Sequence, residues 1–369
     1  MRRASRIDKP LTILLVILVV GGAFVFSSAA FGLLGRGETH ITSVVFNHFA
    51  LGLGLGLLAL LLGLTVDYRI WRRYALALYI AALALTALVF IPTLGLEHGG
   101  GTRWLDIFGF SFQPSEVLKV AAIIMAAAYF AGMKTKTATF SYGLGGFIGL
   151  MVAPAVLLLL QPDLGTLGVI SISVLAVYIA AGARWRDVAI VIVLAMLALG
   201  AIAIMRPYVM DRLLTFINPA QGQHDQAYQI RQSLIAIGSG GFSGRGFGQG
   251  VQKFTYLPEP MGDSVFAVAA EELGFIGAVG VVATFAAFAL RGLTVGARAP
   301  DLFGALLAIG ISTYLGAEAF VNIAAMLGLA PLTGVPLTFV SQGGSAMLAA
   351  LGSAGLLLNV SRHRARAHA

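Results

Sequence analysis

The segment YLPEPMGDSVFAV, Tyr256 to Val268, places two carboxylates directly before an apolar run. Glu259 and Asp263 are four residues apart and lie among prolines and a glycine. Carboxylates accept protons or pair with cations, and an ionisable group at the mouth of an apolar segment costs free energy. Such a group is a functional-site hypothesis by default, but the local sequence alone leaves open what uses Asp263.

A second group of ionisable residues lies in GGGTRWLDIFGFSFQPSEVLK, residues 99–119. Glu116 and Lys119 are three residues apart and share a helix face. Two interpretations are open: a local ion pair that lets one helix bury two charges, or a functional pair at membrane depth. Upstream, three glycines predict a flexible loop in which Arg103 and Trp104 lie at the membrane interface, the ordinary place for a tryptophan.

The segment AIGSGGFSGRGFGQGVQKF, residues 236–254, contains seven glycines. Glycine lets backbone N–H groups approach a ligand closely, and Arg245 and Lys253 add two positive charges. The pattern predicts a cradle for an anion, and a plain flexible loop is the alternative. It contains neither a GxxxxGK[ST] phosphate loop nor the strand and helix of a dinucleotide fingerprint.

Two more polar segments interrupt apolar sequence. QPDLGT, residues 161–166, separates two apolar runs, and the simplest role for Asp163 is the N-cap of the second run. PLTGVPLTFVSQGGS, residues 331–345, contains two prolines and three glycines. Irregular backbone at membrane depth is tolerated where it is buried in protein or lines a cavity. We therefore expect a re-entrant loop facing a cavity, with a tight turn between helices as the alternative.

The composition indicates that a membrane bundle positions these groups. Of the 369 residues, 58% are hydrophobic and 11% are charged, whereas a soluble domain carries about 25% charged residues. We predict an all-α polytopic membrane protein with a single domain, residues 1–369, and ten transmembrane helices of about 20 residues each. The predicted spans are 11–33, 44–64, 74–93, 114–131, 142–160, 165–182, 187–206, 266–290, 302–326 and 342–360.

One connection, residues 207–265 between the seventh and eighth predicted spans, is much longer than the others. Loops of this length are usually functional or disordered, and its many aromatic and apolar residues favour a folded one. Within QAYQIRQSLIAIG, helical spacing places Tyr228, Gln232 and Ile235 near one face.

The distribution of Lys and Arg predicts the orientation. These residues concentrate on alternate connections, beginning with the N-terminal segment, so the positive-inside rule places both termini in the cytoplasm and the long connection outside. Topology therefore explains the net charge of +8 without a nucleic-acid partner. The N-terminal sequence also resembles a cleavable signal peptide, but its apolar stretch continues to Leu34, so we expect a retained helix.

Cysteine is absent, which excludes disulfides and thiolate chemistry. The six histidines are scattered and form no ligand-spaced pair on a helix, so the sequence predicts no structural metal site.

Four blocks of the sequence resemble, in the same order, the blocks of the SEDS family (shape, elongation, division and sporulation). They are TRWLDIFGFSFQPSEVLK, QPDLGT, the stretch from FINPAQGQ to EELGFIG, and NIAAMLGLAPLTGVPLTFVSQGGS. The blocks are long, and the resemblance covers essentially the whole chain. The segment QKFTYLPE is more similar to the FtsW branch of the family than to the RodA branch.

Two blocks depart from the family pattern. The family's LPExHTDF is LPEPMGDS here, so Met261 and Gly262 replace His and Thr, and Ser264 replaces Phe. The family's FVSYGGSS is FVSQGGSA, with Gln342 in place of Tyr. The acid is kept, whereas any role of the missing His and Thr, such as orienting the acceptor, is placed in doubt.

The resemblance implies a ten-span peptidoglycan glycosyltransferase in the bacterial cytoplasmic membrane, active in cell division or cell-shape maintenance. Such an enzyme polymerises lipid II at the outer face, inverts the reacting sugar centre and releases undecaprenyl pyrophosphate. Its partners are a class B penicillin-binding protein transpeptidase, other divisome or elongasome proteins and membrane lipids. No cofactor bound by the protein is expected, with Mg²⁺ only as a companion of the substrate pyrophosphate.

The family's essential acid maps onto Asp263, the expected general base. The residues expected to bind substrate are Arg103, Trp104, Glu116, Lys119, Gln232, Ser239, Arg245, Lys253, Glu259, Ser341, Gly343 and Gly344.

Two other functions stay open at this point. A lipid II flippase or transporter also uses broken spans and intramembrane charge, although no inverted repeat is found here and the large loop is one-sided. A division scaffold whose chemistry has lapsed is supported only by the altered His-Thr pair.

Overall fold

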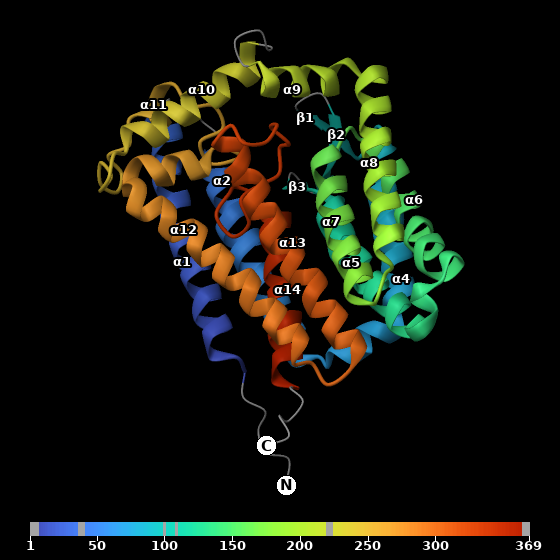
Figure 1. The fold of residues 1–369 in the computed structure, drawn as a ribbon. Helices are drawn as coiled ribbons and strands as arrows, with labels where there is room; N and C mark the ends of the chain where they lie inside the picture. The colour runs from blue at the N-terminus through green and yellow to red at the C-terminus, as the bar shows by residue number, and fades with distance from the viewer. Residues whose placement is uncertain (1–6, 36–40, 99–100, 108–109, 219–223, 364–369) are drawn as a thin grey trace.

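A computed structural model describes residues 7–35, 41–98, 101–107, 110–218 and 224–363 of the chain, which are predominantly helical (Figure 1). Nine helical segments among these residues are long and apolar enough to cross a membrane. They are α1 (Lys9–Gly35); the continuous α2 (Ile41–Phe46), η1 (Asn47–Gly54) and α3 (Leu55–Thr65); α4 (Tyr68–Ala87) with η2 (Leu88–Phe90); α5 (Pro114–Met133) with η3 (Lys134–Ala138); η4 (Phe140–Leu144) with α6 (Gly145–Leu160); α8 (Trp185–Met205); α12 (Val265–Ala297); α13 (Leu302–Met326); and α14 (Gly344–Arg362).

A tenth apolar helix, α7 (Leu164–Ala180), occupies the place of the sixth predicted span. Its 17 residues extend about 25 Å at ~1.5 Å per residue, less than the ~30 Å hydrocarbon core of a bilayer. All ten predicted ranges therefore coincide with helices, and nine of them meet the length expected of a span. The count of ten membrane spans stays a prediction.

Aspartates cap the starts of α4, α13 and α7. The side chain of Asp67 accepts from the backbone N–H of Arg69 at the start of α4, and Asp301 accepts from that of Gly304 in α13, both at 2.9 Å. At the start of α7, Asp163 accepts from the N–H of Thr166 at 3.1 Å. Each bond satisfies a backbone donor that has no partner inside its helix. The predicted N-cap role of Asp163 is confirmed.

The all-α prediction is wrong for the connection between α4 and α5. This connection forms a three-stranded antiparallel sheet of β1 (Gly95–His98), β2 (Gly101–Ile107) and β3 (Phe110–Phe112). Leu105 of β2 lies between Gly95 at the start of β1 and Phe112 at the end of β3 and is buried. The flexible loop was predicted from the glycines at 99–101, of which 99 and 100 lie outside the described residues, whereas Gly101 begins β2. A glycine of β1 allows close packing, because a side chain at Gly95 would clash with the carbonyl of Val89.

The long connection between α8 and α12 is folded where the structure describes it, as predicted. It contains α9 (Pro207–Ile217), α10 (His224–Ser239) and the short α11 (Gln252–Thr255). In Figure 1, α9 and α10 lie across one end of the bundle, the end at which the sheet also lies. α1 begins and α14 ends at the opposite end.

The centre of the bundle is formed by α13 and α14. The structure buries 67% of the α13 span and 78% of the α14 span, compared with 11% of α8, which lies at the outside. The chain between these two central helices is irregular, and its apolar side chains Leu332, Val335 and Leu337 are buried. This buried irregular backbone agrees with the re-entrant segment predicted at 331–345.

The first helix is packed into the same bundle. α1 contacts α12 along its length, and a side chain at Gly22 would clash with the carbonyl of Phe339 in the re-entrant segment. Asp8, which directly precedes α1, forms an ion pair of 2.9 Å with Arg291 near the C-terminal end of α12.

Candidate active site

Asp263 lies in a tight turn immediately before α12. The backbone N–H groups of Gly262 and Ser264 both donate to the carbonyl of Glu259, each at 3.1 Å. Glu259 has a positive φ of 46°, an unusual conformation for a residue with a side chain. Glu259 is exposed and Asp263 is partly buried. The turn thus carries both carboxylates at the end of the bundle covered by α9 and α10.

The re-entrant segment lies directly against this turn. The hydroxyl of Ser341 donates to the carbonyl of Gly262 at 2.8 Å, and the side-chain amide of Asn322 on α13 donates to that of Asp263 at 3.0 Å. Gly334 lies beside the carboxylate itself, since a Cβ there would be 3.8 Å from Asp263 Oδ2. The structure therefore brings Ser341 to Asp263, as predicted, but its hydroxyl contacts protein backbone.

Opposing influences set the pKa of Asp263. Burial and the negative charge of Glu259 raise it, the positive charges of Arg212 and Arg103 lower it, and the net result is a pKa of about 6. A carboxyl with this pKa is still mostly ionised at neutral pH and is a stronger base than an ordinary aspartate.

Arg103 reaches this site from β2. Its guanidinium donates to the backbone carbonyl of Gln161 at 3.2 Å and to that of Pro162. These carbonyls belong to the break between α6 and α7, so the arginine is anchored by backbone and keeps its full positive charge.

Arg212, on α9, was missed by sequence reasoning. Its guanidinium carbon lies 5.8 Å from the centre of the Tyr208 ring, and its buried Nε has no hydrogen-bond partner among the described residues. Burial lowers the pKa of Arg212, and the charge of Arg103 lowers it further. Two arginines that act on each other and on Asp263 suit an anionic ligand. The Tyr208–Arg212 spacing on one helix face was the available signal, but nothing in it identified the partner.

Glu116 and Lys119 lie in the core of the bundle and form a local ion pair. The ammonium of Lys119 is 2.7 Å from a carboxylate oxygen of Glu116 and also contacts Glu318 of α13. The hydroxyl of Thr338 donates to the second oxygen of Glu318 at 3.0 Å. The lysine side chain is 1% exposed. Of the two interpretations, the geometry favours the buried pair, with Glu318 as a member that the local sequence did not reveal.

The glycine-rich segment is a cradle for the protein's own carboxylates. The backbone N–H of Val251 donates to Glu271 at 2.8 Å, and that of Gly248 donates to Glu272 at 3.1 Å. Both acids lie on the first turns of α12 and are buried. The prediction of an anion cradle was correct in form, but the anions are side chains of this chain.

The polar side chains of the same segment pair with these two acids. Arg245 lies 3.6 Å from Glu271, and the hydroxyl of Ser239 lies 3.4 Å from it. Lys253 is fully buried, with its ammonium 2.5 Å from Glu272 and 2.6 Å from the hydroxyl of Ser28 on α1. The expectation that Lys253 contacts a substrate phosphate is therefore not supported by its position, because its charge is already neutralised.

The glycine-rich segment also completes a break in α12. Gly274 has a φ of 68°, so the helix hydrogen bonding is interrupted there. The N–H of Arg245 donates to the carbonyl of Glu271 at 3.1 Å, and the N–H of Phe275 donates to that of Gly241 at 2.9 Å. Backbone from the loop thus replaces the missing helical partners.

The other residues expected to bind substrate lie on β2, on α10 and at the start of α14. Trp104 is partly buried on β2, opposite Leu96. Gln232 is partly buried on α10. Gly343 is the N-cap of α14, and a Cβ on Gly344 would lie 3.1 Å from the carbonyl of Asn47 in η1. The two glycines therefore serve the close packing of α14.

No group of three or more His, Cys, Asp or Glu side chains placed to hold a metal ion is found in the described ranges.

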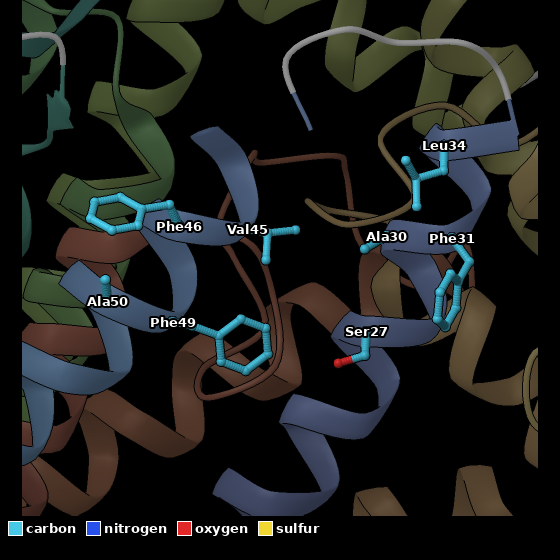
Figure 2. Close-up of a pocket in the computed structure, with 8 residues that line it drawn as sticks. All are labelled: Ser27, Ala30, Phe31, Leu34, Val45, Phe46, Phe49 and Ala50. Carbon is cyan, nitrogen blue, oxygen red and sulfur yellow. The ribbon is translucent and has the colours of Figure 1, made fainter. Parts of the chain in front are cut away.

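An apolar cavity of about 590 Å³ lies near the same end of the bundle (Figure 2). α1 forms one wall, and α2 with η1 forms the other. Phe31, Leu34 and Phe46, at its rim, are each more than half exposed. On its inner side, Ala30 and Phe49 belong to the same apolar cluster as Met261, two residues before Asp263. The lining residues are Ser27, Ala30, Phe31, Leu34, Val45, Phe46, Phe49 and Ala50.

The chain is similar in sequence to a family of known proteins. The profile of the family described as "Cell cycle protein", FTSW_RODA_SPOVE, matches residues 9–366. Stage V sporulation protein E of Bacillus subtilis (strain 168) is 35% identical over 310 residues, which cover 84% of this chain and 85% of that protein. A probable peptidoglycan glycosyltransferase FtsW of Geobacter sulfurreducens (strain DL-1 / KN400) is 39% identical over 312 residues, covering 84% and 82%.

Two solved structures are similar over nearly the whole chain. One comes from work on the coordination of polymerization and crosslinking by a peptidoglycan synthase complex. It has a TM-score of 0.75 at 28% identity and covers 96% of this chain and 98% of that chain. The crystal structure of the Thermus thermophilus rod shape determining protein RodA has a TM-score of 0.69 at 28% identity and covers 98% of both chains. The matched range includes every element that lines the candidate site.

Proposed function

The chain belongs to the FTSW_RODA_SPOVE family of cell cycle proteins, and we propose that it is a peptidoglycan glycosyltransferase. It polymerises lipid II into glycan strands at the outer face of the bacterial cytoplasmic membrane. The identity of 39% to an FtsW protein, against 28% to the RodA structure, makes it FtsW-like and favours a role in cell division.

The observation that carries this proposal is the carboxylate of Asp263 under the electrostatic influence of two arginines, Arg103 and Arg212. The reaction joins the 4-hydroxyl of a GlcNAc to C1 of the MurNAc of a second chain. Asp263 accepts the proton of the attacking hydroxyl, and a base whose pKa is about 6 suits that step at neutral pH. The C1–oxygen bond breaks on the opposite face, which inverts the sugar centre, and undecaprenyl pyrophosphate leaves with both electrons.

The leaving pyrophosphate carries negative charge that needs positive partners. Arg103 and Arg212 supply them, because neither forms an ion pair with a carboxylate in the described part of the chain. Lys119 and Lys253 do not take part, since each is held by buried acids. Since no metal-binding group of three or more His, Cys, Asp or Glu side chains is found in the described ranges, we propose that a magnesium ion enters only with the pyrophosphate.

The apolar cavity between α1 and α2 accepts the polyprenyl tail. It is lined almost entirely by carbon, it is exposed at its rim, and its inner wall packs against the turn that bears Asp263. A tail held there leaves the sugars beside the carboxylate.

The chain crosses the membrane ten times, with α7 as the short sixth span, and both termini lie in the cytoplasm. The positive-inside distribution of Lys and Arg supports this orientation. The similarity to a peptidoglycan synthase complex that couples polymerization to crosslinking supports a class B penicillin-binding protein as partner, within the divisome or elongasome.

The test is polymerisation of labelled lipid II by the purified protein with its transpeptidase partner. Asp263→Asn keeps the size of the side chain and removes the base, and we expect the rate to fall by about 10²–10⁴-fold. Asp225→Asn, an exposed aspartate on α10, is the matched control and should polymerise at the wild-type rate. If Asp263→Asn polymerises lipid II at the wild-type rate, Asp263 is not the general base. Transbilayer movement of lipid II without polymer formation would favour a flippase instead.

A further inference from the structure

Three successive carbonyls of the catalytic turn accept hydrogen bonds from outside it. Met261 accepts from the backbone N–H of Gln342 at 2.6 Å. Gly262 accepts from the hydroxyl of Ser341 at 2.8 Å, and Asp263 accepts from the side-chain amide of Asn322 at 3.0 Å. All three donors come from α13 or the re-entrant segment that follows it. The next carbonyl along the chain, that of Ser264, is the first that accepts hydrogen bonds from backbone N–H groups of α12.

The donors are themselves fixed. The amide of Asn322 is 1% exposed, and its nitrogen also donates to the carbonyl of Val335 at 2.9 Å. The hydroxyl of Ser341 accepts from the backbone N–H of Leu337 at 2.8 Å, so its proton points at Gly262. These contacts fix the donors, because each side chain makes a second hydrogen bond to the segment between α13 and α14.

Within the turn, Met261 and Gly262 supply no hydrogen bond that could orient the carboxylate. Met261 is buried in an apolar cluster with Phe26, Leu257 and Val268, and Gly262 has no side chain. The hydrogen bonds that hold the carbonyls of residues 261–263 therefore come from the facing segment.

We propose that Asn322 and Ser341 are positioning residues, which hold the backbone of the catalytic turn so that the Asp263 carboxylate faces the acceptor hydroxyl. This inference rests on the proposed function and deepens it. Ser341, expected from the sequence to bind substrate, acts instead through Gly262. Misplacement of a reacting group by about 1 Å costs ~10²-fold in rate, so loss of either donor should lower turnover more than substrate binding.

The chain offers closely matched controls. Asn359, on α14 at the other end of the bundle, is also 1% exposed and donates to two carbonyls, those of Leu64 at 2.7 Å and Val66 at 2.9 Å. Asn322→Ala and Asn359→Ala therefore remove the same kind of contact, one at the catalytic turn and one far from it. Ser361 on α14 is fully buried and its hydroxyl, like that of Ser341, accepts from a backbone N–H and donates to a backbone carbonyl, so it provides the equivalent control.

The experiment measures kcat and KM for lipid II, per folded molecule, together with Tm. We expect Asn322→Ala and Ser341→Ala to lower kcat by about 10- to 100-fold with KM changed less than about 3-fold. Ser341→Thr keeps the hydroxyl and should retain kcat within about 3-fold. Asn359→Ala and Ser361→Ala should lower Tm and leave kcat unchanged.

Two results overturn the proposal. One is a kcat for Asn322→Ala that matches Asn359→Ala after correction for folded protein. The other is a Ser341→Thr enzyme as slow as Ser341→Ala. If Asn322→Ala does not fold, the serine pair decides alone. Wild type and Asp263→Asn in the same assay test the proposed function separately: an active Asp263→Asn enzyme refutes the base, whatever the positioning variants do.

Discussion

Opposing effects act on the pKa of Asp263: burial and the negative charge of Glu259 raise it, whereas the positive charges of Arg212 and Arg103 lower it. Gly262 permits the approach of Glu259: a Cβ at position 262 would lie 3.2 Å from a carboxylate oxygen of Glu259. The family pattern has Thr at this position, so the glycine gives this chain's second carboxylate room to lie over the turn. This departure from the family pattern therefore affects the pKa of Asp263, the proposed base.

This arrangement predicts a pH profile. A base must be deprotonated, so the polymerisation rate should fall as the pH drops through about 6. Glu259→Gln removes a negative charge that raises the pKa of Asp263, and the acid limb should move to lower pH. The measurement is the initial rate between pH 4.5 and 8 for both proteins. An acid limb that stays in place or moves upward in Glu259→Gln contradicts the coupling.

At this scale the sequence singled out Asp263, Glu259, Arg103 and Ser341 as candidates, because each lies in a segment of unusual composition or resemblance. Arg212 was missed because its proposed role depends on residues of β2 and of the turn before α12, which are distant in sequence. Asn322 was missed for the same reason, since an asparagine inside an apolar helix does not reveal which carbonyls it contacts.

Among the elements, the glycine-rich segment and the first turns of α12 form one unit. The segment supplies N–H groups to Glu271 and Glu272, Lys253 supplies charge, and loop backbone completes the helix where Gly274 breaks it. The sequence predicted a cradle with nearby cations but not its occupants, because Glu271 and Glu272 lie in a different segment of the chain.

The buried ion pair between Lys253 and Glu272 predicts what happens when the lysine is replaced. Lys253→Met leaves Glu272 buried without its cation, which should destabilise the protein by about 3–5 kcal/mol. The double variant Lys253→Met/Glu272→Gln has no uncompensated charge and should recover most of the Tm and the polymerisation rate. Thermal unfolding in detergent and the lipid II assay measure both. A double variant that is stable but inactive would return Lys253 to the substrate-binding residues.

The long helices were predictable because an apolar run of about 20 residues has few other structures open to it. The sheet between α4 and α5 was not, because its strands are short and glycine there resembles a flexible loop. Only the clash that a side chain at Gly95 would create shows why glycine is required.

For the whole molecule, the two most buried helices are also the two that flank the re-entrant segment. The catalytic turn is thus supported from the rigid centre of the bundle, while the cavity lies towards its surface, between α1 and α2. This division places Asp263 next to the most buried part of the bundle and the apolar cavity at its surface.

The orientation of the whole chain is directly testable, because the native sequence contains no cysteine. Single substitutions Asp225→Cys on α10 and Thr135→Cys on η3 introduce exposed thiols at the two predicted sides. A membrane-impermeant maleimide applied to intact spheroplasts should label position 225 and should label position 135 only after the membrane is permeabilised. The reverse pattern contradicts the proposed topology.

The cavity between α1 and α2 has a consequence for how the enzyme encounters its substrate. Since its rim residues Phe31, Leu34 and Phe46 are exposed on the bundle surface, we expect a polyprenyl tail to enter sideways without leaving the hydrocarbon. The relevant concentration is then the mole fraction of lipid II in the bilayer. Diluting the membrane with other lipids should slow the reaction, while diluting the vesicles in buffer should not.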